Sequence, residues 1–203
     1  MAMKLSLDAL LNKTIALHNH LCPRQVLGVR MGMLAGEILN LDLPQDDKRL
    51  FAFVETDGCF ADGVAVASGC WLGHRTMRLM DYGRVAATFV DTDTAEAIRI
   101  WPHPESRRFA EQAHPHEESN WKAQLIGYQS LPNDKLLGWQ PVELTVSMQE
   151  IISKPGLRVI CSRCGEEVLN EREEIVDEQP VCPACLGEAY YQQTTDKYEL
   201  VSH

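Results

Sequence analysis

Four cysteines near the C-terminus have the spacing of a metal site. Cys161 and Cys164 form one Cys-x-x-Cys pair, Cys182 and Cys185 form a second, and 17 residues separate the pairs. This spacing is typical of structural zinc sites, in which each pair spans one edge of a tetrahedron and a hairpin brings the pairs together. Gly165 suits the turn with positive φ that often follows such a pair. We expect one zinc ion bound by all four thiolates, with two separate redox motifs as the alternative.

A second cluster lies near the N-terminus, in the segment HNHLCP, which contains His18, His20 and Cys22. Imidazole and thiol ligands together suit zinc, nickel or another borderline-soft metal. Three ligands do not close a site, and Cys59 in the segment ETDGCFAD is the natural fourth. Three nearby carboxylates are candidates for further ligands or for partners that orient them: Glu55, Asp57 and Asp62. The sequence therefore predicts a core site for a second transition metal, zinc or nickel.

The same residues allow two other interpretations. Cys22 or Cys59 beside a histidine could be a catalytic thiolate nucleophile. Alternatively, the histidine could be a hydrogen-bonded core residue and Cys22 a small buried apolar side chain. Cys70 lies among small and apolar residues and is expected to be packed in the core. The remaining histidines of the middle segment are expected in solvent-facing loops: His103, His114 and His116.

The pattern of apolar residues predicts the elements that position these clusters. Ser6 can cap a helix that ends near His18, and proline limits it at Pro23. A strand is expected over Leu144–Met148, after the other elements. Those are helices over 24–39, 60–69, 104–112 and 119–129, a strand over 50–56, and a hairpin of strands over 84–92 and 95–101. Helices first and then mixed elements indicate an α+β fold.

Composition limits the classes of function. The chain has 203 residues with 29 acidic and 19 basic side chains, a net charge of −10. This charge argues against binding to nucleic acid or to a membrane surface. No segment has the length of a membrane span or the pattern of a signal peptide, so we expect a cytoplasmic protein. Proline and glycine at Lys154-Pro155-Gly156 predict a boundary between a core domain, 1–154, and a zinc module, 155–203.

Three segments resemble FmdE, a family of formylmethanofuran dehydrogenase components: HNHLCPRQVLGVRMG (18–32), VETDGCFADGVAVASGCWLG (54–73) and DYGRVAATFVD (81–91). The resemblance covers roughly residues 10–150, and the tail matches the zinc finger that some members carry. It implies helices packed on a mixed sheet like that of glyceraldehyde-3-phosphate dehydrogenase, with a zinc-ribbon or treble-clef module. It also implies a homodimer and a metal or active site that includes His18, His20, Cys22 and Cys59.

The chain departs from the family pattern near that site. Asn19 and Arg24 stand where the family usually has glycine, and Gly73-His74-Arg75 replaces a Gly-Lys-Gly-like stretch. Arg24 and the His74-Arg75 pair add cationic groups that suit an anion such as molybdate, tungstate or phosphate.

The sequence thus favours a metal-binding accessory or regulatory protein, with a molybdenum or tungsten enzyme as a possible protein partner. One alternative is an enzyme of one-carbon or molybdenum- or tungsten-related redox metabolism that uses the core site. The other is a zinc-finger transcriptional regulator, although residues 155–203 contain ten acidic and four basic residues. That net charge of −6 disfavours contact with phosphate.

Overall fold

A computed structural model describes residues 5–152 and 156–192. The chain divides into two compact units, Met1–Val146 and Ser147–His203. The boundary expected at 154/155 lies outside the described residues. Of the described helices, none has the length and apolar character needed to cross a bilayer.

The first unit contains six helices among its described residues, and those expected from the sequence are present. Ser6 caps the first of them, because its hydroxyl accepts a hydrogen bond from the Ala9 N–H at 3.2 Å. Ser119 caps the fifth in the same way through the Lys122 N–H. The helices are α1 (Leu7–His18), α2 (Pro23–Ile38), α3 (Cys59–Ser68), α4 (Ser106–Ala113), α5 (Asn120–Ser130) and α6 (Asn133–Leu136).

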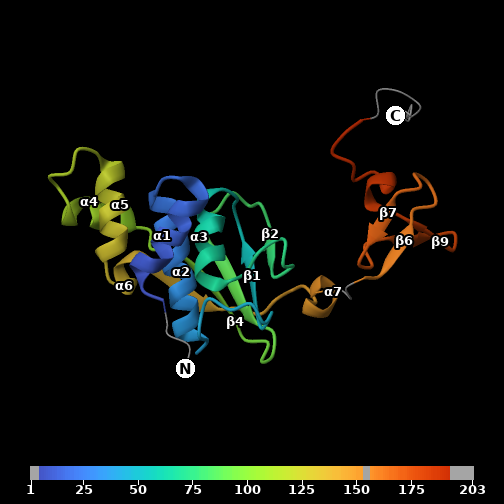
Figure 1. The fold of residues 1–203 in the computed structure, drawn as a ribbon, viewed down its shortest axis with the longest axis horizontal. Helices are drawn as coiled ribbons and strands as arrows, with labels where there is room; N and C mark the ends of the chain where they lie inside the picture. The colour runs from blue at the N-terminus through green and yellow to red at the C-terminus, as the bar shows by residue number, and fades with distance from the viewer. Residues whose placement is uncertain (1–4, 153–155, 193–203) are drawn as a thin grey trace. The chain divides into compact units, whose positions relative to one another are not determined.

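A five-stranded sheet forms the rest of this unit, in the order β2-β1-β3-β4-β5. The strands are β1 (Leu50–Val54), β2 (Met77–Leu79), β3 (Ala87–Asp91), β4 (Ala97–Pro102) and β5 (Leu137–Pro141). The first two strands are parallel and all other pairs are antiparallel, so the sheet is mixed. The predicted hairpin corresponds to β3 and β4, with Ala87 opposite Ile100. The α+β class with helices on a mixed sheet is confirmed (Figure 1).

Two helices of the core approach each other unusually closely. A side-chain carbon on Gly28 of α2 would lie 2.3 Å from the Phe60 carbonyl oxygen of α3, and one on Gly63 would lie 2.4 Å from the Gln25 carbonyl oxygen. Gly32, one turn further along α2, faces Ala67, one turn further along α3. The helices therefore run parallel with their N-terminal ends together, and glycine is required at the contact.

One predicted strand was wrong. Residues Leu144–Met148 form no strand, and the last strand of the sheet is β5, which ends at Pro141. Instead, a short helix, α7 (Met148–Ile152), begins after Ser147. The Ser147 hydroxyl accepts a hydrogen bond from the Glu150 N–H at 3.3 Å, so local capping starts a helix where the apolar pattern favoured a strand.

The second unit is small and built from hairpins. Its strands are β6 (Arg158–Ile160), β7 (Glu167–Leu169), β8 (Glu174–Val176) and β9 (Gln179–Val181), paired antiparallel as β6-β7 and β8-β9. A 3-10 helix, Pro183–Leu186, follows. Its buried residues are only Cys161, Val168 and Val181 among those described. So small an apolar cluster stabilises little by itself, and the unit needs a further cross-link such as a metal ion.

Candidate metal centres and the adjoining pocket

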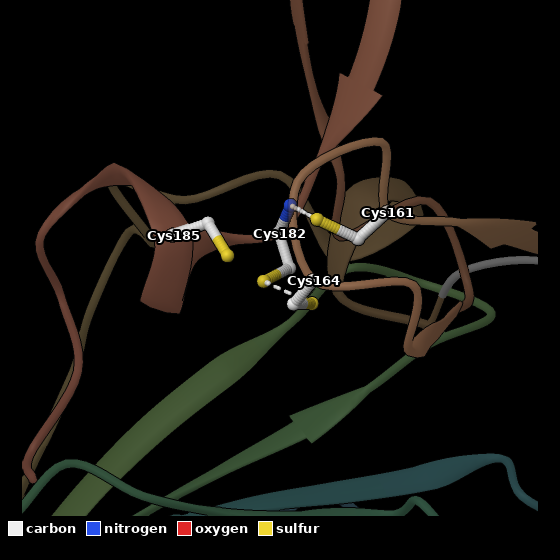
Figure 2. Close-up of side chains that lie close together, drawn as sticks. All are labelled: Cys161, Cys164, Cys182 and Cys185. Atoms are coloured by element: carbon white, nitrogen blue, oxygen red, sulfur yellow. Dashed lines mark hydrogen bonds between the residues drawn. The ribbon is translucent and has the colours of Figure 1, made fainter. Parts of the chain in front are cut away.

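The tail cysteines converge as their spacing predicts. Figure 2 shows the four side chains gathered around one point, and their sulfur atoms all lie within 4.8 Å of one another. The Cys164 and Cys182 sulfur atoms are 3.9 Å apart. That is close to the separation of about 3.8 Å that tetrahedral Zn–S bonds of about 2.3 Å require. It is far longer than a disulfide bond of about 2.05 Å. The four cysteines form a group that can hold a metal ion.

The backbone around this quartet favours a charged sulfur. The Cys182 N–H lies 3.3 Å from the Cys161 sulfur. Hydrogen bonds from the backbone of Cys164 and of Cys182 lower the pKa of Cys161 to about 6, whereas its neighbours raise the pKa of Cys185 to about 12. Four thiolates this close repel one another, so a cation is needed before all four lose their protons.

The N-terminal cluster is built by three helix ends. His18 closes α1, Asn19 follows in a left-handed conformation at φ 57°, and His20 lies in the turn that leads to α2. Cys59 is the first residue of α3. One ligand atom from each of His18, His20 and Cys59 lies within 4.8 Å of the others. The structure thus brings together three of the four residues predicted for the core site.

Hydrogen bonds fix which nitrogen of each histidine is free. His18 Nε2 pairs with the Asp62 carboxylate, and His20 Nδ1 lies 2.9 Å from the His18 carbonyl oxygen. Both oxygens accept, so both of these nitrogens carry a proton. The His18 Nδ1 and His20 Nε2 lone pairs remain for a metal ion. A carboxylate behind a histidine is the arrangement that orients metal ligands, and of the three predicted carboxylates Asp62 occupies it.

Cys22 lies beside this group as the N-cap of α2. Burial raises the pKa of Cys59, and the adjacent Cys22 thiol raises it further. Without a bound cation Cys59 is therefore a neutral thiol at pH 7, which weighs against an unassisted nucleophile. The Cys22 N–H donates to Gln25 Oε1 at 2.7 Å. Gln25 is fully buried, and its Nε2 has no hydrogen-bond partner within the described ranges.

A pocket of about 840 Å³ opens beside the two thiols, with Cys22 and Cys59 in its lining. Its walls come from the end of β4, the segment leading into α4, and α5. Residues that were not predicted for the site line it, among them Arg99, Trp101 and Arg107. His103, expected in a solvent-facing loop, also lines it. Arg24 lines the pocket as its cationic character suggested, whereas His74 and Arg75 do not.

A buried ion-pair network lies behind one wall of the pocket. The Glu55 carboxylate accepts from Arg99 at 2.6 Å and 2.8 Å and pairs with Arg84 at 2.7 Å. Burial opposes ionisation of Glu55, but the two arginines outweigh it and hold its pKa below the ordinary value. Glu55 was predicted as a possible ligand or ligand partner, and it instead holds two arginines. The signal in the sequence was a charged residue inside each of two apolar strand segments, LFAFVE and AIRIW.

Comparison with known proteins supports the resemblance seen in the sequence. The family model described as "FmdE, Molybdenum formylmethanofuran dehydrogenase operon" matches residues 17–138. This range includes His18, His20, Cys22 and Cys59.

Two individual proteins are similar to the chain. A protein of Archaeoglobus fulgidus named "Probable S-adenosyl-L-methionine-binding protein" is 34% identical over 205 residues, which cover 91% of this chain and 54% of that protein. The chain thus spans about half the length of this curated relative. A crystal structure of an FmdE-like protein of tungsten formylmethanofuran dehydrogenase from Syntrophus aciditrophicus matches with a TM-score of 0.59 at 19% identity. It covers 93% of this chain and 96% of that chain, and it supports the fold alone. On the family match over more than half of its residues, the chain belongs to the FmdE family.

Proposed function

We propose that this chain is a metal-binding accessory or regulatory protein of the FmdE family, with a transition metal in its core and a structural zinc in its tail. The observation that carries the core site is the group of His18, His20 and Cys59, whose ligand atoms lie within 4.8 Å of one another. Two imidazoles and a thiolate suit zinc or nickel, and Cys22 is the nearest further thiol. Such a set leaves a coordination position open, which suits sensing or delivery of a metal.

Zinc is the metal proposed for the tail. Four sulfur ligands at tetrahedral separation select a soft or borderline ion without geometric preference, and zinc meets both conditions. The role is structural because no position is left for a substrate.

The partners we propose are a second copy of the chain and a protein such as a molybdenum or tungsten enzyme. The tail unit carries a net charge of −6 over residues 155–203, which favours protein over nucleic acid as its contact. All seven cysteines are free thiols in the structure, and this fits a reducing, cytoplasmic location.

Elemental analysis of the purified chain tests the proposal. We expect close to two metal ions per chain: one removed by Cys161→Ser and the other by His20→Asn or Cys59→Ser. Cys70→Ala is the matched control, since Cys70 is a buried thiol outside both groups whose sulfur bonds the Leu50 carbonyl oxygen. A single zinc per chain that is lost only with the tail cysteines would overturn the core site.

A second candidate function is catalysis, because the 840 Å³ pocket ends at the thiols of Cys22 and Cys59. The S-adenosyl-L-methionine named for the Archaeoglobus relative is one candidate ligand. It carries a sulfonium and an ammonium group against one carboxylate, so the arginines of the pocket disfavour it. Titration of the chain with S-adenosyl-L-methionine tests this, and tight binding would move the preference toward the enzyme.

A further inference from the structure

The pocket beside the thiols has a charge opposite to that of the whole chain. Its lining includes four arginines, Arg24, Arg84, Arg99 and Arg107, and no aspartate or glutamate is part of it among the described residues. The chain as a whole has ten more acidic than basic residues. A concave surface lined by one sign of charge concentrates ligands of the other sign. The pocket is therefore selective for anions.

Two of the four arginines lack a counter-ion within the part of the chain that the structure describes. Arg84 and Arg99 share the single carboxylate of Glu55. Arg24, in the first turn of α2, and Arg107, on α4, form no ion pair with any described residue. Arg107 instead lies at the hydroxyl of the buried Tyr128. Two guanidinium groups at the pocket thus have donors to offer to a carboxylate or a phosphate.

Helix ends add to this positive field. Cys22 and Pro23 begin α2, Cys59 begins α3, and all three line the pocket. The parallel packing at Gly28 and Gly63 places the two N-terminal ends side by side. Each N-terminus carries a partial positive charge, and here they reinforce four arginines in one cavity.

Aromatic rings complete the lining. Trp101 from β4 and Trp121 from α5 both line the pocket, and the Trp121 side chain is 51% exposed. A partly exposed indole in a pocket offers a flat apolar face for stacking. Arg99 lies over the Trp101 ring at 5.4 Å, so cation and ring already form one surface. The volume is in the range of pockets for small organic ligands.

We propose that this pocket binds a small organic anion with a planar ring, whose carboxylate or phosphate is held by Arg24 and Arg107 and whose ring stacks on the tryptophans. The bound ligand reaches the thiols of Cys22 and Cys59. This inference deepens the proposed function, on which it rests for the metal at the thiol end, by naming the class of ligand that the core site would meet.

Calorimetric titration of the full chain with 1-naphthyl phosphate tests the proposal. We expect binding that is at least about tenfold tighter than that of 1-naphthol, which has the ring without the charge, and of inorganic phosphate, which has the charge without the ring. 1-Naphthoate distinguishes a carboxylate from a phosphate as the preferred group. Equal affinity for 1-naphthol and 1-naphthyl phosphate, or no binding of either naphthyl anion, would overturn the proposal.

Neighbouring residues supply matched controls. Arg107→Gln should weaken binding of 1-naphthyl phosphate about tenfold, whereas Arg108→Gln should leave it unchanged. Arg108 is next to Arg107 on α4 but pairs with Glu105 and does not line the pocket. In the same way, Trp121→Leu should weaken binding and Trp139→Leu should not, although both side chains are about half exposed. Equal losses within either pair would contradict the site.

Metal analysis of the same samples separates this inference from the proposed function. If Cys59→Ser loses the core metal and still binds 1-naphthyl phosphate, with the loss in Arg107→Gln preserved, the pocket stands whatever metal it meets. If the chain holds a core metal and the probe shows no preference for anions, the metal site stands and the pocket proposal fails.

Discussion

The two cysteine-containing groups differ in how their ligands are held. The tail quartet comes from two tight turns in one small unit, and its four sulfur atoms can complete a coordination sphere. The group of His18, His20 and Cys59 comes from the ends of separate helices, and it adjoins a pocket of about 840 Å³. The first arrangement suits a metal that holds the fold together, and the second suits a metal that meets a ligand.

This difference also predicts what each group depends on. The tail unit has a very small apolar cluster, so its fold should follow its metal. The N-terminal group lies on a large core in which α2 and α3 are fixed by backbone contact. Its metal should follow the fold.

Removal of one tail thiol is the largest expected change. Cys161→Ser should abolish binding of the tail metal and unfold residues 156–192, while the core of the first unit keeps its unfolding transition. Zinc content and the dispersion of amide NMR signals measure both effects. Ser162→Ala in the same turn is the control, and a folded tail without zinc in Cys161→Ser would contradict the dependence.

A small change at the α2–α3 contact reverses the order of cause. Gly28→Ala would place a carbon 2.3 Å from the Phe60 carbonyl oxygen and 2.8 Å from the Val64 nitrogen. Because both are backbone atoms, we expect a loss of about 3 kcal/mol in the unfolding free energy of the first unit. The core metal should then dissociate more readily, with the tail zinc unchanged.

Urea denaturation and metal content measure the two results together. Gly73→Ala is the matched control, since no heavy atom lies within 4 Å of the added carbon. If both variants are equally stable, the close approach of α2 and α3 is not what holds Cys22 near Cys59.

Glu55→Gln should have a smaller effect on the same unit. It leaves two arginines without their counter-charge, and we expect a loss of about 2 kcal/mol. This is below the value for a fully buried pair because the Arg84 side chain is 58% exposed. Glu96→Gln, at an exposed position of the β3–β4 hairpin, makes the same charge change and should be neutral.

The pH dependence of this variant has a defined sign. The pKa of Glu55 is lowered in the folded chain. Its contribution is therefore present above the ordinary carboxyl pKa of about 4.3 and is lost as the pH falls through the lowered value. The stability gap between the wild type and Glu55→Gln should be constant from pH 7 to about pH 5 and close at lower pH. A gap that widens in acid would contradict the ion pair.

Local signals were enough to predict the tail site. The spacing of Cys161, Cys164, Cys182 and Cys185 specifies its geometry, because a pair of ligands on a tight turn needs no distant contact. The cap at Ser6 and the β3–β4 hairpin were predictable for the same reason. At Ser147 a local signal was overlooked, since its hydroxyl cap overrides the apolar residues that favoured a strand.

The surroundings of the N-terminal group were not predictable in this way. HNHLCP marks the ligands, but the approach of Cys59 depends on Gly28 and Gly63 meeting across the helix pair. The pocket draws on β4, α4 and α5, which are far from Cys22 in the chain. Only Arg24 was identified from sequence as a cationic group near the site, and the arginines of the other walls carry no spacing rule that joins them.

The finest test of the comparison changes the partner of a ligand instead of a ligand. Asp62 bonds His18 Nε2 and so leaves Nδ1 for a metal ion. Asp62→Asn should weaken the core metal about tenfold or more, since loss of such a partner releases the orientation of the imidazole. The tail zinc has no such support, so its affinity should not change. Competition with a chromogenic chelator measures both affinities in one sample, and Asp57→Asn, at an exposed position two residues before Cys59, is the control. If Asp62→Asn binds the core metal as the wild type does, His18 does not act through the free nitrogen that this hydrogen bond leaves, and the N-terminal group loses the feature that distinguishes it from three donors that are merely close.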